Sequence, residues 1–119
     1  MDENCTIYRM ADFFGKKWTL LILLELYKGI KDYKRFNQIK RGIKGITPKM
    51  LSLRLSELEN RGLVKKKINS DKVPVESRYY LTESGKDFIR IIKDIKAWVL
   101  KWQIDNELCK GLDCKDCEL

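Results

Sequence analysis

Apolar residues recur along the chain at two spacings, which predict five helices and one pair of strands. Spacings of three and four residues mark one face of a helix, whereas short runs with alternating side chains are typical of strands. The expected helices cover residues 6–14, 17–28, 33–41, 47–61 and 82–108, and the expected strands cover residues 63–68 and 77–81. The predicted fold class is therefore mainly α with a small β-hairpin (α+β).

The helix of residues 47–61 has clear start and stop signals. Thr47 can cap the free backbone amides, Pro48 suits the first helical position because it has no N–H to leave unpaired, and Gly62 follows as a stop. An advance of 100° per residue places three leucines on one side of this helix. The opposite face carries Lys49, Ser52, Leu53, Ser56 and Asn60. A leucine among small and cationic residues is unusual for a surface that faces only water.

The polar connector of residues 69–74 is long enough for the hairpin of residues 63–82 to protrude as a wing. The last helix, residues 82–108, carries one apolar face and spans roughly 39 Å, which exceeds the depth of a domain of this size. Part of that face must be covered from outside the monomer, and a second copy of the chain is the simplest candidate. Residues 1–108 are expected to form a single domain, followed by a cysteine-containing tail of residues 109–119.

Charge and composition limit the classes of function that this chain can have. The 119-residue chain has no histidine, which removes Ser-His-Asp and Cys-His nucleophile activation, so an enzyme is not expected. The formal net charge is +8, and residues 28–78 hold 15 of the 25 Lys and Arg but only five of the 17 Asp and Glu. This concentration of positive charge favours an anionic partner, with nucleic acid ahead of an acidic membrane surface; a lysine-rich solvated surface is the alternative.

The positive segment coincides with the predicted helix–turn–helix and hairpin, an arrangement that binds double-stranded DNA. The helix of residues 47–61 would enter the major groove, and the hairpin would reach along the backbone. Residues of the recognition helix expected to contact bases or phosphates are Thr47, Lys49, Ser52, Leu53, Arg54 and Ser56. Expected contacts from the wing and the preceding helix are Lys65, Lys67, Lys72, Arg78, Arg35 and Lys40. Strand alternation places Lys65 and Lys67 on one face and Lys66 on the other.

Six blocks of sequence occur in unbroken order between residues 5 and 102: GKKWTLLIL (15–23), RFNQIK (35–40), ITPKMLSLRLSELE (46–59), GLV (62–64), PVE (74–76) and YLTESG (80–85). In these blocks the chain closely resembles the HxlR-type winged helix–turn–helix transcriptional regulators. The resemblance implies a winged helix–turn–helix with additional N- and C-terminal dimerisation helices. It also implies a homodimer on a pseudo-palindromic operator, with residues 47–61 as recognition helix and residues 63–82 as wing.

Cys5 matches a cysteine that many members of this family carry just before the first helix. The resemblance implies that this thiol senses oxidants or electrophiles, although the proline that commonly follows it is Thr6 here. A helix N-terminus favours the thiolate, which is the reactive form. A buried, inert cysteine at a dimer seam is the alternative.

The tail holds Cys109, Cys114 and Cys117, which lie outside the resemblance. Their C-x4-C-x2-C spacing is that of three ligands of a plant-type iron–sulfur cluster, and Cys5 could supply the fourth if the termini meet at the dimer seam. Four thiolates could equally hold zinc. A disulfide switch within the tail or with Cys5 is a third interpretation, and a tail without a function is the fourth.

The primary prediction is thus a sequence-specific, DNA-binding transcriptional regulator that acts as a homodimer. The N-terminus lacks the pattern of a secretory signal, and the longest apolar stretch, residues 18–24, is shorter than the ~20 residues of a membrane-spanning helix. We therefore expect a cytoplasmic protein with no membrane partner. Two alternatives stay open: a non-specific architectural DNA-binding protein, and a winged-helix protein-interaction module or redox adaptor.

Overall fold

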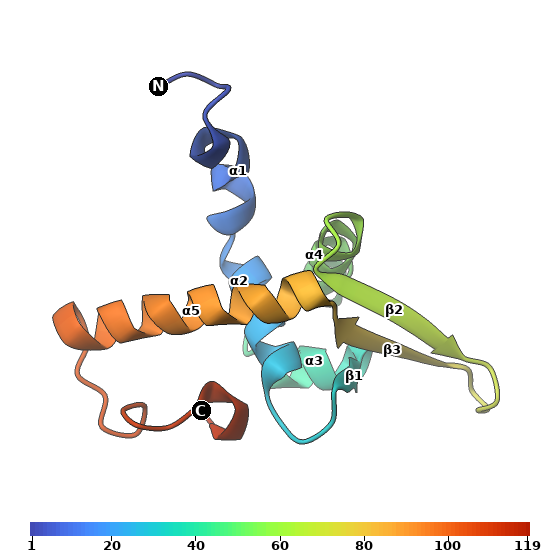
Figure 1. Cartoon of the computed structure of the whole chain (residues 1–119). Helices are drawn as coiled ribbons and strands as arrows, with labels where there is room; N and C mark the ends of the chain where they lie inside the picture. Colours follow the sequence, from blue (N-terminus) through green and yellow to red (C-terminus); the bar gives the residue numbers. More distant parts are fainter.

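A computed structural model describes all 119 residues and shows five α-helices with a three-stranded antiparallel sheet (Figure 1). The helices are α1 (Thr6–Phe14), α2 (Lys17–Tyr27), α3 (Phe36–Gly42), α4 (Pro48–Asn60) and α5 (Glu83–Trp102), the strands are β1 (Tyr33–Arg35), β2 (Val64–Asn69) and β3 (Glu76–Leu81), and a short 3-10 helix, η1 (Cys114–Asp116), lies in the tail. This architecture confirms the predicted winged helix–turn–helix. None of its helices combines the length and apolar character needed to cross a membrane.

Helix α2 lies at the centre of the hydrophobic core, because it is apolar on almost all sides. Ile22 and Leu23 have no exposed surface, and the helix contacts α1, α3, α4, α5 and β3. In Figure 1, α5 crosses in front of α2, while α4 and the strands extend to the right. Helix α4 presents Leu51, Leu55 and Leu58 to the core, and each is at most 1% exposed. This burial fixes the rotation of α4 and leaves its opposite side outside.

The prediction of one helix over residues 33–41 is wrong at its start. Tyr33–Arg35 form β1, whose first residue lies opposite Tyr80 of β3. Helix α3 begins only at Phe36, and the Gln38 side chain accepts a 2.9 Å hydrogen bond from the amide just before it. The apolar residues have helical spacing here, but pairing with a strand far along the chain overrides it. The expected hairpin is consequently the larger part of a three-stranded sheet.

The last helix is shorter than the predicted 82–108. It ends at Trp102, where the amides of Gln103 and Ile104 both donate to the Val99 carbonyl oxygen and close the final turn. The helix of 20 residues spans about 30 Å, and Figure 1 shows its end projecting to the left of the other helices. One apolar stripe on it stays exposed and consists of Ile91, Ile95, Trp98 and Trp102. The reason for expecting a second copy of the chain therefore persists in the shorter helix.

The tail folds back against the end of α2 and the side of α5 (Figure 1). The Asp113 carboxylate accepts hydrogen bonds from the Tyr27 hydroxyl at 2.8 Å and from the Lys93 ammonium at 3.0 Å. The Gly29 amide also donates to the Lys115 carbonyl oxygen at 2.9 Å. The hydrogen bond from the Lys115 amide, followed in effect by the one from Lys93, holds the pKa of Asp113 well below its usual range. Hydrogen bonds to Tyr27 and Asp113 raise the pKa of Lys93 to about 12. The tail is thus an ordered part of the fold.

A single residue, Thr82, joins the wing to the last helix. Its amide donates to the Leu63 carbonyl oxygen at 3.0 Å, and its hydroxyl donates to the Gly62 carbonyl oxygen. The same hydroxyl accepts a 3.2 Å hydrogen bond from the Gly85 amide and caps α5. The end of β3, the start of α5 and the turn before β2 are therefore bonded together at one point.

Gly85 is expected to be required by this junction. A Cβ at this position would overlap the Leu63 carbonyl oxygen. We expect Gly85→Ala to lower the free energy of unfolding by about 1–3 kcal/mol, even though alanine favours helices. Urea denaturation followed by circular dichroism measures this loss. Ser84→Ala, at the exposed neighbouring position, is the control and should change stability by less than about 0.5 kcal/mol; equal effects of both substitutions would contradict the prediction.

Candidate nucleic-acid interface

Helix α4 gathers the predicted base-contacting residues on one exposed face. The Thr47 hydroxyl accepts a 3.1 Å hydrogen bond from the Met50 amide, and Pro48 occupies the first helical position, as the sequence predicts. Because the three buried leucines point inward, the outward face consists of Lys49, Ser52, Leu53 and Ser56, all exposed. Leu53 is 49% exposed. The geometry thus places an apolar side chain at the middle of a polar, cationic helix face.

Arg54 does not belong to this face. Its side chain is only 14% exposed and its guanidinium lies 2.8 Å from the Glu57 carboxylate. The other Glu57 oxygen lies 3.4 Å from the ammonium of Lys16, at the start of α2. Arg54 therefore helps to tie α4 to α2, and its guanidinium is not presented to an incoming phosphate.

The wing has two different faces, and the predicted alternation of its lysines is confirmed. The ammonium groups of Lys65 and Lys67 lie over the ring of Tyr80, at 5.6 and 5.2 Å from its centroid. The ammonium of Lys66 instead lies 5.7 Å from the ring of Tyr79, which is buried in the core. All three lysines are exposed. The outer face of the sheet is therefore cationic, while the inner face packs on the helices.

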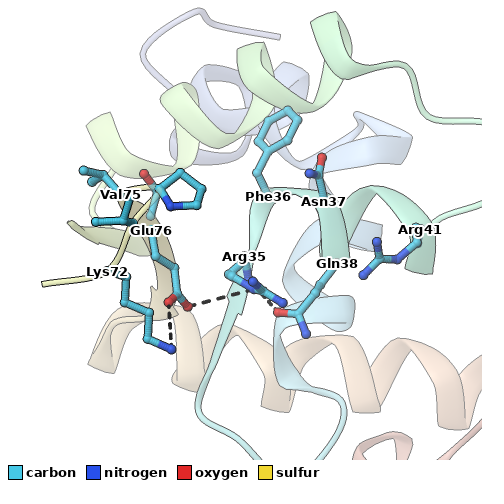
Figure 2. Close-up of a pocket in the computed structure, with 11 residues that line it drawn as sticks. Arg35, Phe36, Asn37, Gln38, Arg41, Lys72, Val75 and Glu76 are labelled. Carbon is cyan, nitrogen blue, oxygen red and sulfur yellow. Dashed lines mark hydrogen bonds and ion pairs between the residues drawn. The ribbon is translucent and has the colours of Figure 1, made fainter. Parts of the chain in front are cut away.

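A groove of about 630 Å³ separates the wing from α3 (Figure 2). Its cationic side chains come from both walls and are Arg35, Arg41 and Lys72, with Asn37 and Gln38 on the α3 wall. Arg35 and Lys72 are 55% and 60% exposed. Lys40, also predicted to contact the backbone, lies in the last turn of α3 and is half-buried. The cationic surface therefore extends beyond the predicted wing, across the groove to α3.

Glu76 is a functional candidate that sequence reasoning did not single out. Its side chain is 9% exposed, and its carboxylate lies 3.2 Å from Arg78, 3.6 Å from Lys72 and 3.9 Å from Arg35. Burial opposes its charge, but these three cations outweigh burial and hold the pKa of Glu76 below its ordinary value. The hydrogen bond to Glu76 is in turn the main reason that the pKa of Arg78 is raised. The signal in the sequence was the two-residue spacing of Glu76 and Arg78 on one strand, which places both side chains on the same face.

Arg78 is consequently less exposed than we expect of a wing side chain that contacts a phosphate. Its side chain is 24% exposed, and its guanidinium lies over the ring of Tyr33 at 4.3 Å from the centroid. The Tyr33 ring itself packs against Tyr80, with centroids 5.5 Å apart. Arg78 is held within the sheet, while the lysines of the wing remain exposed.

The four cysteines are not gathered into a metal-holding group within the single chain. No three Cys, Asp or Glu side chains lie close enough together to hold a metal ion. Cys5 is the N-cap residue of α1, and Figure 1 shows α1 at the top of the molecule and the tail at the bottom. All four cysteines are free and half-buried, and Cys109 and Cys114 line one cavity of about 330 Å³ between α5 and the tail. The zinc and iron–sulfur interpretations, which bring the termini together at a dimer seam, stay predictions.

A short helix, a turn, a second helix with an exposed polar face and a cationic wing together define a winged helix–turn–helix DNA-binding domain. A model of the HxlR-like helix–turn–helix matches residues 13–107. The chain belongs to this family of transcriptional regulators, in agreement with the expectation that it is not an enzyme.

Relatives and solved structures support the same assignment. The uncharacterized HTH-type transcriptional regulator YvaP of Bacillus subtilis is 34% identical over 101 residues, which cover 84% of this chain and 90% of YvaP. The reduced form of the transcriptional regulator YodB from B. subtilis has a TM-score of 0.72 and 32% identity, covering 87% of this chain and 98% of that chain. The redox regulator HypR in its oxidized form has a TM-score of 0.71 and 32% identity, covering 84% and 99%. Regulators that respond to redox state are thus among the structurally similar proteins.

Leu53 is expected to be dispensable for folding, because its side chain is half exposed and lies outside the core. Leu53→Ala should change the free energy of unfolding by less than about 0.5 kcal/mol. Leu55→Ala, two positions along the same helix and fully buried, should cost about 2–5 kcal/mol. Urea denaturation of both variants measures the difference. A large loss in Leu53→Ala would assign this leucine to the core and remove it from the interface.

Proposed function

We propose that this chain is a sequence-specific DNA-binding regulator that acts as a homodimer on a pseudo-palindromic operator. The observation that carries the proposal is the exposed face of α4, where a lysine, two serines and a leucine project together from a helix whose other side is fully buried. A helix held in this way can enter the major groove with a fixed rotation. The cationic wing and groove beside it supply attraction to the DNA backbone.

Each exposed side chain of α4 has a chemistry suited to base edges. The Lys49 ammonium can donate to guanine O6 and N7 or to a flanking phosphate, and the hydroxyls of Ser52 and Ser56 can donate or accept. Leu53 is suited to a thymine methyl group, which only the major groove displays. Phosphate contacts set the position of the protein and not its sequence preference; those proposed here are Arg35, Lys40, Lys65, Lys67 and Lys72.

The homodimer is supported by the exposed stripe on α5. Trp98 and Trp102 are 56% and 64% exposed, and Ile91 and Ile95 lie on the same side. Two tryptophans and two isoleucines in line are a costly surface to leave in water, and a two-fold related copy would cover them. Such a dimer presents two recognition helices, which matches a site with two half-sites.

A thiol-based response through Cys5 is the finer part of the proposal. Cys5 is the residue before the first turn of α1 and is half-buried. The likeness to the redox regulator HypR supports this role. A hydroperoxide would transfer one oxygen atom to the Cys5 sulfur, which gives a sulfenic acid and releases the corresponding alcohol.

Replacing Lys49 tests the assignment of the recognition helix. Lys49→Ala should weaken binding to a duplex selected by the wild-type protein from a random-sequence pool by about 5- to 100-fold, because a base contact is lost. Lys67→Ala on the wing should weaken binding less and lower the slope of log affinity against log salt by about 1. Fluorescence anisotropy at several salt concentrations measures both.

The same titrations separate the alternative functions. Equal wild-type affinity for the selected duplex and a scrambled duplex would favour a non-specific architectural protein. No binding to either duplex would favour a protein-interaction module or redox adaptor.

Replacing Cys5 tests the thiol response. Treatment with a hydroperoxide should weaken binding of the wild-type protein to the selected duplex, since oxidation of Cys5, the N-cap residue of α1, would add a polar group at the start of that helix. Cys5→Ser should bind equally well before and after treatment, and dithiothreitol should restore the wild-type protein. Cys117→Ser, which keeps Cys5, is the control and should respond like wild type. A response that persists in Cys5→Ser would locate the switch in the tail.

A further inference from the structure

The groove between the wing and α3 has one acidic side chain, and it lies among the cations of that surface. Glu76 is the only carboxylate that lines the groove. Its partners come from three different places: Arg35 from the end of β1, Lys72 from the connector between β2 and β3, and Arg78 from β3. Figure 2 shows the Glu76 carboxylate between the side chains of Lys72 and Arg35. A single anion thus links the wing connector to the start of α3.

This carboxylate competes with DNA for the cations that DNA needs. Arg35 and Lys72 are both more than half exposed and could each contact a phosphate. A phosphate at a direct hydrogen-bonding distance can replace the carboxylate as the partner of these cations, because charge-assisted bonds to phosphate are strong and ion pairs near the surface are weak. A phosphate that stays separated by water cannot, because its interaction is screened by solvent and salt. Glu76 therefore keeps these cations from a loosely bound backbone, and a closely fitted backbone must break the ion pairs of Glu76 to bind them.

The backbone of Arg35 also has a hydrogen-bond partner, Gln38, which restricts the position of the residue. The amide of Arg35 donates to the Gln38 side chain at 2.9 Å, so the backbone of this residue is fixed at the start of α3. Lys72 lies in the connector, which has no strand pairing of its own. With Glu76 between them, the two cations are held at the two walls of one groove. Without the negative charge of Glu76, the Lys72 side chain would move with the connector.

We propose that Glu76 is an intramolecular competitor of the DNA backbone, which holds Arg35 and Lys72 in the free protein so that only the phosphates of a fully docked backbone bind them. When α4 fits its base sequence in the major groove, phosphates reach the groove and exchange with the carboxylate. When the bases do not match, the phosphates stay farther away and the cations remain neutralised by Glu76. The proposal rests on the proposed function, because it requires α4 to discriminate between sequences.

The test compares Glu76→Gln with Asp71→Asn. Both substitutions remove one negative charge from the wing, but the exposed Asp71 carboxylate takes part in no ion pair, so its removal changes charge without releasing cations. The probes are the duplex selected by the wild-type protein and a scrambled duplex of the same length and composition. Binding is measured by fluorescence anisotropy over a range of salt concentrations.

Glu76→Gln is expected to raise affinity for the selected duplex by about three- to fivefold, because its phosphates no longer have to displace a carboxylate. Affinity for the scrambled duplex should change by less than about twofold, because its phosphates stay separated by water and are screened. The ratio of the two affinities should therefore rise about two- to fivefold. Asp71→Asn should raise both affinities by the same small factor and leave the ratio unchanged. Equal shifts for both duplexes in Glu76→Gln, or no shift in either, would overturn the proposal.

A double-mutant cycle distinguishes competition for these cations from a merely structural role. Lys72→Gln should weaken binding to the selected duplex by less than about twofold in the wild-type background, because the lost phosphate contact is offset by an ion pair that no longer has to break, but by about three- to fivefold in Glu76→Gln. Additive effects would contradict competition by Glu76. Circular dichroism of each variant reports whether the wing and helices are retained. Failure of the wild-type protein to select any duplex would instead contradict the proposed function.

Discussion

The burial of three leucines on one side of α4 is the constraint on which the interface depends. Leu51, Leu55 and Leu58 are closed off from solvent by α2 and the sheet. Burying one leucine contributes about 1.5–3 kcal/mol, and a domain of this kind is stable by only about 5–15 kcal/mol in total. A rotation of α4 that exposed all three would remove most of the stability of the domain. The direction in which Lys49 and Leu53 point is therefore set by the core.

The cations of the middle segment divide into two groups with different partners. Arg54 and Arg78 are largely enclosed and hold elements of the fold together through Glu57 and Glu76. The wing lysines and Arg35 remain exposed and make only weak contacts with the rest of the chain. Exposed ion pairs contribute little to stability, so these side chains can change partners at small cost. The net charge of this segment thus overstates the number of cations that are available to DNA.

Local sequence signals predicted most of the helices, because those signals act within one turn. Thr47 and Pro48 mark the start of α4, and the outward position of Leu53 follows from the helical period alone. Signals that depend on partners elsewhere in the chain were not visible. β1 exists because β3 pairs with it, and the enclosure of Arg54 depends on Glu57 and on Lys16 from another helix. The same holds for the tail, whose order comes from Tyr27 and Lys93 and not from its own composition.

The single-residue junction at Thr82 has a mechanical consequence. A longer linker would absorb a change in the direction of α5, but here three hydrogen bonds hold the end of β3, the start of α5 and the turn before β2 together. The last helix and the wing are therefore coupled at Thr82. A partner that tilts the far end of α5 would also move the wing connector at the other end of the molecule.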